Sequence, residues 1–89
     1  MRVHNLNGTS DNEPNAPFHS WIAYWKHYKG LTPVRCPKCG NLLSDPVGAH
    51  VQKESLLDRS WYIVPICRGC NKANTSFDVD ASLLLKATL

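Results

Sequence analysis

Long apolar runs are missing from the sequence, so we expect neither an export signal nor a membrane anchor. Its first ten residues, MRVHNLNGTS, have no apolar run after the charged residue, so they do not resemble a secretory signal peptide. No stretch of the 89 residues approaches the apolar length that spans a bilayer. We therefore expect a cytoplasmic protein with no membrane partner, in which cysteines stay reduced.

Internal repeats and low-complexity tracts are also absent, and 89 residues provide one domain with little to spare. A core of this size is marginal, and a structural metal ion is a common remedy. We expect residues 1–89 to form a single α+β domain with a polar N-terminal segment at 1–16. The net charge of +3 is mild, and it permits a nucleic-acid partner without requiring one.

The chain has only four cysteines, which form two CxxC pairs separated by 27 residues. Each pair can place two sulfurs on one side of a tight turn, and two such turns facing each other make a tetrahedral four-sulfur cage. That cage suits one structural zinc ion. The alternatives are disulfides or free buried thiols, but redox-active CxxC pairs are usually found near a βαβ pattern, which is missing here. The predicted zinc ligands are Cys36, Cys39, Cys67 and Cys70.

One segment, residues 17–30, has the periodicity of an amphipathic helix. Asn15 is placed to cap its first turn, and Gly30 is placed to end it. We expect its aromatic face to pack in the core, although the same rings would also suit base stacking. The residues of that face are Phe18, Trp21, Ile22, Trp25 and Tyr28.

Two further segments predict a β-hairpin: PVGAHV at 46–51 and WYIVPI at 61–66, with a polar loop between them. Pro65 requires an edge strand or a bulge at its position. The string that begins at Cys67, CRGCNKAN, is expected to start a short helix. Residues 75–89 are expected to form a C-terminal strand and a helical turn.

A zinc knuckle, a β-hairpin and a short helix with the second ligand pair occur in the order of a treble clef. This zinc-stabilised core is expected at residues 34–74, with the N-terminal helix packed on it. The strings GAHV at 48–51 and VPICRGCN at 64–71, together with the CxxC pairs, resemble the HNH nuclease family. The resemblance covers about half of the chain.

The resemblance implies that His50 matches the strand histidine that acts as a general base toward a phosphodiester. Asn71 matches the last histidine of the family's motif, and Asn74 lies one turn further, so both are candidate ligands of a second divalent ion. The chain departs from the family at Ala49, where a metal ligand is common, and at Tyr62, which aligns with the family's asparagine. A structural histidine that bonds across the hairpin is the alternative reading of His50.

The sequence is compatible with three functions. The favoured one is an HNH-like zinc domain that binds DNA or RNA without catalysis. The alternatives are an active, divergent HNH endonuclease and an adaptor that binds a protein partner, which would expose a contiguous apolar patch. The residues expected to contact nucleic acid are Lys53, Arg59, Arg68 and Lys72.

Overall fold

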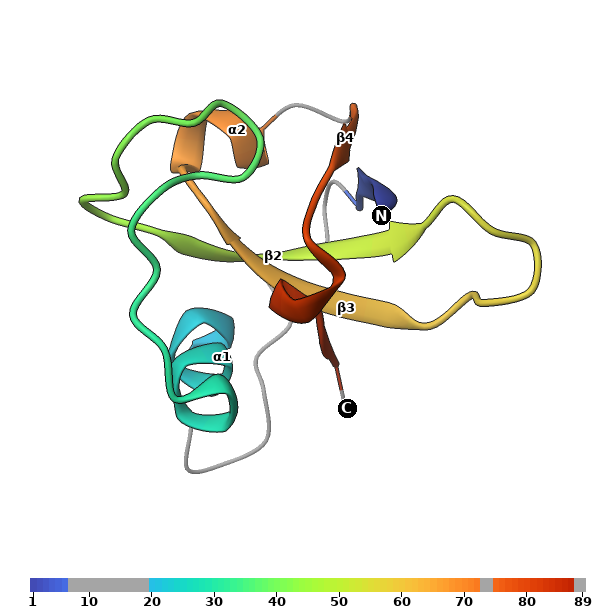
Figure 1. Cartoon of the computed structure of the whole chain (residues 1–89), viewed down its shortest axis with the longest axis horizontal. Helices are drawn as coiled ribbons and strands as arrows, with labels where there is room; N and C mark the ends of the chain where they lie inside the picture. Colours follow the sequence, from blue (N-terminus) through green and yellow to red (C-terminus); the bar gives the residue numbers. More distant parts are fainter. Residues whose placement is uncertain (7–19, 73–74, 88–89) are drawn as a thin grey trace.

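The computed structural model describes residues 1–6, 20–72 and 75–87, and it has a five-stranded antiparallel sheet in the order β4-β1-β2-β3-β5 (Figure 1). A nine-residue helix packs on this sheet, so the α+β class predicted from the sequence is confirmed. The elements in chain order are β1 (Arg2–Asn5), α1 (Trp21–Lys29), β2 (Val47–Lys53), β3 (Trp61–Ile66), α2 (Arg68–Asn71), β4 (Ser76–Asp78), η1 (Ala81–Leu83, a 3₁₀ turn) and β5 (Leu85–Lys86).

Strands β2 and β3 form the hairpin at the centre of the sheet. Residues 47–52 pair with residues 61–66 in a regular antiparallel register. On the far side of β3, the short strand β5 pairs only with Tyr62 and Ile63. Pro65 therefore lies where β3 is an edge strand, and its missing N–H interrupts no ladder on that side, as the sequence predicts.

The first strand, which belongs to the polar segment at residues 1–16, lies inside the sheet between β2 and β4. Val3 is fully buried, and Asn5 is buried on the same strand. The ammonium group of Met1 donates a hydrogen bond to the carbonyl of Val79 at 3.0 Å. The pairing with β4 joins segments more than seventy residues apart, which a local reading of polarity does not detect.

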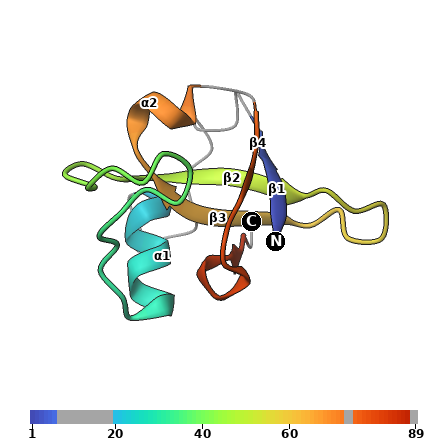
Figure 2. The same ribbon diagram turned by 45° about the horizontal axis from the view of Figure 1, so that its top comes forward.

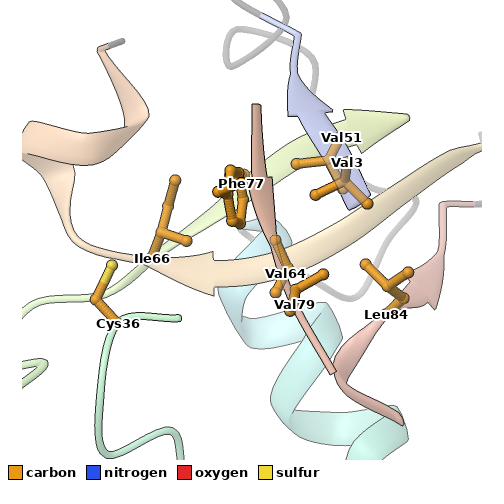
Figure 3. Close-up of a cluster of buried hydrophobic side chains, with 9 residues drawn as sticks. Val3, Cys36, Val51, Val64, Ile66, Phe77, Val79 and Leu84 are labelled. Atoms are coloured by element: carbon orange, nitrogen blue, oxygen red, sulfur yellow. The ribbon is translucent and has the colours of Figure 1, made fainter. Parts of the chain in front are cut away.

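Alternate side chains of the hairpin point to opposite faces of the sheet, and one face carries the main core (Figure 3). Cys36 packs into this core beside Ile66, so the first cysteine pair is anchored to the hairpin. The buried members of the main core are Val3, Cys36, Ala49, Val51, Val64, Ile66, Phe77, Val79 and Leu84.

Helix α1 covers the other face of the hairpin, where Trp21 and Trp25 pack with Ile63. The indole Nε1–H of Trp25 donates to the carbonyl of Leu83 at 2.8 Å, which ties α1 to the C-terminal segment. Tyr28 is 59 % exposed, so the predicted aromatic face is only partly buried. Figures 1 and 2 both show α1 and α2 on opposite sides of the hairpin.

Helix α1 begins at Trp21, later than the start predicted for the helix at 17–30. Ser20 has extended backbone angles, and its hydroxyl oxygen accepts an N–H of the first turn at 3.2 Å, so Ser20 is the N-cap. The predicted cap, Asn15, lies outside the described residues. Gly30, in the left-handed conformation, ends the helix. None of the described helices has the length and apolar composition needed to cross a bilayer.

The first turn of α1 lies directly on Gly48 of β2. A Cβ atom at Gly48 would stand 2.6 Å from the backbone nitrogen of Ile22 and 2.6 Å from the carbonyl carbon of Trp21. Backbone atoms cannot give way as a flexible side chain can. The absence of a side chain at Gly48 therefore sets how closely α1 approaches the sheet.

We predict that Gly48→Ala lowers the free energy of unfolding by about 2–3 kcal/mol, because α1 must lift off the hairpin. Gly69→Ala is the matched control, since a Cβ at Gly69 meets nothing within 4 Å. That control is expected to be neutral or slightly stabilising, because alanine favours the helix. Urea unfolding of the metal-loaded proteins measures both effects, and equal midpoints for the two variants would refute this account of the helix contact.

Candidate metal centre

The first cysteine pair lies in a tight turn whose ends are joined by a β-bridge between Arg35 and Leu42. The N–H of Gly40 donates to the carbonyl of Cys36 at 2.8 Å, which closes the turn. Gly40 has a φ of 78°, in the left-handed region that glycine enters without strain. The turn therefore presents the sulfurs of Cys36 and Cys39 together.

The second pair is organised by the start of α2. Cys67 is the N-cap of this helix, and its sulfur accepts the N–H of Cys70 at 3.4 Å. The carbonyl of Cys67 accepts the N–H of Asn71 at 3.1 Å. The sulfur thus takes the position that a serine or aspartate oxygen takes in an ordinary cap, and Cys70 follows on the same side of the helix.

The two turns face each other and bring the four sulfur atoms within 4.8 Å of one another. The sulfurs of Cys39 and Cys67, one from each pair, are 3.8 Å apart. A tetrahedral ion with metal–sulfur bonds of about 2.3 Å holds its sulfurs about 3.8 Å apart, so the cluster has the size for one ion. No two of these cysteines form a disulfide. The two pairs meet, as predicted, at one site that could hold a metal ion.

The four cysteines have unequal surroundings. Burial acts to raise the pKa of the Cys36 thiol, but backbone N–H groups of Cys67, Cys39 and Lys38 outweigh it and lower that pKa to about 7. Burial raises the pKa of Cys70, and hydrogen bonds shared with the other thiols raise it further. Four thiolates at this spacing repel one another strongly, and a divalent cation at their centre removes that repulsion.

His50, the candidate general base, lies in β2 with only 2 % of its surface exposed. Its ring meets the rings of Trp21 and Trp61 edge to face, with centroids 4.8 Å and 5.6 Å away. Nε2 has no hydrogen-bond partner within the described part of the chain, and burial lowers the pKa of the imidazole. A ring enclosed in this way is a neutral core residue that a phosphodiester does not reach.

The sheet separates His50 from the other candidate catalytic residue that the structure describes. His50 packs against α1, whereas its neighbour Ala49 points into the main core on the side of α2. Asn71, the last residue of α2, accepts a hydrogen bond on its carbonyl from Nδ2 of Asn5 at 2.7 Å. His50 and Asn71 therefore do not share a site, and Asn74 lies outside the described residues.

The candidate phosphate-contacting residues fall into two groups, and the first lies at the loop end of the hairpin. The ammonium of Lys53 is 3.3 Å from a carboxylate oxygen of Asp58. Tyr62 donates its hydroxyl to the same oxygen at 2.6 Å, and this bond holds the pKa of Asp58 well below its usual range. Arg59 is exposed nearby. Lys53 ends β2 and Arg59 lies in the loop that follows, which projects at the end of the hairpin away from α2 (Figure 1).

The second group lies beside the metal ligands. Arg68 pairs with Asp45 at 2.6 Å, and Lys72 is exposed just after α2. The structure adds two cations that the sequence analysis missed: Arg35, exposed before the first ligand, and Lys38, whose ammonium lies 3.4 Å from the carbonyl of Cys70. The sequence could have indicated both residues, since each is adjacent to a cysteine of the first CxxC pair.

No protein-family model, curated protein or solved structure matches this chain.

We predict that each chain binds one metal ion and that a strong chelator abolishes its cooperative thermal unfolding. Loss of the ion leaves the two turns without their main link, and structural metal sites contribute about 10 kcal/mol or more to small domains. Elemental analysis, which also distinguishes zinc from iron, and calorimetry measure these effects.

Cys36→Ser is expected to have the same effect as chelation. The control Ser44→Ala, at an exposed position between the turn that carries Cys36 and Cys39 and strand β2, is expected to keep one ion per chain. Unfolding that is indifferent to the chelator would contradict the four-cysteine site.

We also predict that His50 makes the fold sensitive to acid. An unfolded histidine has a pKa of about 6.5, and burial lowers the pKa of His50 in the folded state. As the pH falls through that interval, the unfolded chain gains a proton that the folded chain excludes, so stability declines.

His50→Phe is therefore expected to lose less stability than the wild type between about pH 7.5 and 5.5, measured by urea unfolding. Any acid effect on the four cysteines is common to both proteins and cancels in the comparison. His27→Phe, at an exposed position of α1, is the matched control. Parallel pH curves for His50→Phe and wild type would show that the imidazole titrates without burial.

Proposed function

We propose that the chain is a zinc-stabilised, non-catalytic domain that binds DNA or RNA through phosphate contacts beside its metal centre. One observation carries the proposal: the four cysteine sulfurs form one cage between two turns, and each turn carries two basic residues next to its ligands. In this arrangement zinc holds the two turns together, and the cations belong to the residues that flank its ligands.

Zinc is the ion that the donor set supports best. Thiolates favour soft or borderline metal ions, and a tetrahedral set of four sulfurs is typical of structural zinc. Because all four positions are taken by cysteine, no position is left for a water molecule that would act as a nucleophile. The ion therefore has a folding role.

The order of the elements supports a treble clef of HNH-like type. A knuckle with Cys36 and Cys39, the hairpin β2–β3 and a helix capped by Cys67 follow one another, and all three meet at the sulfur cluster. This is the arrangement that the strings GAHV and VPICRGCN suggest. The helix is only four residues long, so this member of the class would be a reduced one.

Four cations form the proposed phosphate-binding surface, which keeps Arg68 and Lys72 from the sequence prediction and takes Arg35 and Lys38 in place of Lys53 and Arg59. Arg35 and Lys38 come from the knuckle, and Arg68 and Lys72 come from α2. Four thiolates and one zinc ion carry two net negative charges, so the formal charge of the chain falls from +3 to about +1. The surface is therefore weakly basic, which predicts modest affinity and strong sensitivity to salt.

The mode of binding is set by the length of α2. Four residues of helix extend about 6 Å, which is too short to follow a major groove and present several side chains to base edges. Contacts to phosphate remain, and these position a protein without reading sequence. We infer binding with little sequence preference.

The position of His50 weighs against the nuclease alternative. A general base must approach the proton that it removes, either directly or through one water molecule. His50 is enclosed by Trp21 and Trp61 on the face opposite the metal centre. The residue next to it, Ala49, supplies no ligand for a second divalent ion.

We predict that the zinc-loaded protein binds a labelled duplex and a labelled single strand with micromolar or weaker affinity at low salt. Two to three phosphate contacts give a slope of log K against log salt of about −2 to −3 on duplex DNA. Lys72→Gln should reduce that slope by about one. Lys86→Gln, an exposed lysine on β5, removes the same charge away from the metal centre and should leave the slope unchanged.

Fluorescence anisotropy at several salt concentrations measures these values, and supercoiled plasmid incubated with magnesium or manganese should stay intact. Absence of salt-dependent binding would remove the nucleic-acid proposal. Plasmid nicking that His50→Ala abolishes would instead establish the nuclease.

A further inference from the structure

The loop between β2 and β3, residues 54–60, carries two adjacent leucines that lie almost entirely in solvent. Leu56 is 89 % exposed and Leu57 is 98 % exposed. Figures 1 and 2 show this loop projecting beyond the sheet, at the end of the hairpin away from α2. Single exposed leucines are ordinary, but an adjacent pair on a projecting loop is a distinct apolar feature, here called the leucine knob.

Three side chains hold the base of the leucine knob. The Tyr62 hydroxyl and the Lys53 ammonium both approach one carboxylate oxygen of Asp58, at 2.6 Å and 3.3 Å. The other oxygen of Asp58 accepts the N–H of Ser60 at 3.0 Å. Because Lys53 lies in β2, Asp58 in the loop and Tyr62 in β3, this network fixes the loop to both strands.

Further hydrogen bonds hold the loop closer to the leucine knob. The N–H of Leu57 donates to the hydroxyl oxygen of Ser55 at 3.1 Å, and the N–H of Ser55 donates to the carbonyl of Lys53 at 2.8 Å. The side-chain amide of Gln52 donates to the carbonyl of Arg59 at 2.8 Å. The loop therefore holds its leucines outward, and a partner would bury them with little further loss of conformational entropy.

The charges around the leucine knob favour a protein as its occupant. Lys53 and Arg59 are balanced by Glu54 and Asp58, so the loop and its flanking lysine carry no net charge. Glu54 is also hydrogen-bonded to the hydroxyl of Ser76 on β4. Nucleic acids and acidic bilayers are attracted by unbalanced clusters of lysine and arginine, and this loop has no such excess.

The shape of the leucine knob argues against a second copy of this chain. Two projecting tips in contact would bury little more than four leucine side chains, well below the area of about 1,200 Å² that stable interfaces bury. A concave apolar pocket on another protein encloses both leucines. In that geometry a few buried side chains supply most of the binding energy.

We propose that Leu56 and Leu57 dock together into an apolar pocket of a partner protein. Full burial of one exposed leucine corresponds to a gain of about 10- to 100-fold in affinity. This docking surface lies at the end of the hairpin opposite the metal centre, and it does not depend on nucleic-acid binding at that centre.

The experiment places a photo-crosslinking amino acid at position 57 of the full chain, in the cells that express it, and a second one at position 42 as a control. Leu42 is also an exposed leucine, 66 % exposed, but it lies in the knuckle. The protein crosslinked at position 57 is identified, purified and titrated against the zinc-loaded chain by calorimetry. We expect a one-to-one complex that Leu57→Asp weakens about 100-fold and that Leu42→Asp leaves unchanged.

Other outcomes overturn the proposal. A position-57 probe that yields no discrete protein adduct excludes a docked partner, and a purified adduct that binds Leu57→Asp as well as wild type shows an incidental neighbour. Binding to phosphatidylcholine vesicles, or dimerisation seen by sedimentation equilibrium, would assign the leucines to a bilayer or to a second copy if Leu57→Asp abolished it. The variant itself should unfold as wild type does, because Leu57 makes almost no contact with its own chain.

Discussion

The turn that carries Cys36 and Cys39 is held against α2 mainly by the four cysteine sulfur atoms and the ion that they can bind. Lys38 also reaches the carbonyl of Cys70, and Arg68 pairs with Asp45 at the surface. A surface ion pair contributes at most about 1 kcal/mol, whereas a structural zinc site contributes about ten times as much. An ion at this site would therefore fix the position of α2 and reinforce the packing of Cys36 against Ile66 in the main core.

The features that were predictable from the sequence are the local ones. The two CxxC turns and the two strand segments of the hairpin, 46–51 and 61–66, can each be recognised from a few consecutive residues. The cysteine cluster and the strand pairing both have the expected form in the structure. The position of β1 was not predictable, because its neighbours are β4, over seventy residues later, and β2, about fifty residues later. The start of α1 was missed because the periodic pattern continues before Ser20, while the cap depends on a single hydroxyl and its backbone angles.

In the candidate site too, the features set by local sequence spacing were predictable, and those set by the three-dimensional fold were not. All four ligands were predictable, since their spacing is local. Only half of the cations beside the metal centre were predicted. Lys53 and Arg59 lie between the two cysteine pairs in sequence, but the fold places them at the other end of the hairpin. Arg35 and Lys38, which were not predicted, are next to the cysteines of the first pair. The resemblance to HNH nucleases located His50 on its strand, but the side it faces depends on which helix covers each face of the sheet.

The hairpin separates two surfaces of different chemistry by a fixed distance. Six paired residues lie between the metal centre and the leucine knob, which corresponds to about 20 Å of strand. Both faces of these strands are covered, by α1 on one side and by the main core on the other, so the hairpin has little freedom to bend. Folding alone does not account for Leu56 and Leu57, because neither side chain contributes to either core and a polar residue would serve the loop equally well. The domain buries Trp21 and Trp25 but holds Leu56 and Leu57 outward on a hydrogen-bonded loop. This arrangement suits the docking of the two leucines onto another molecule.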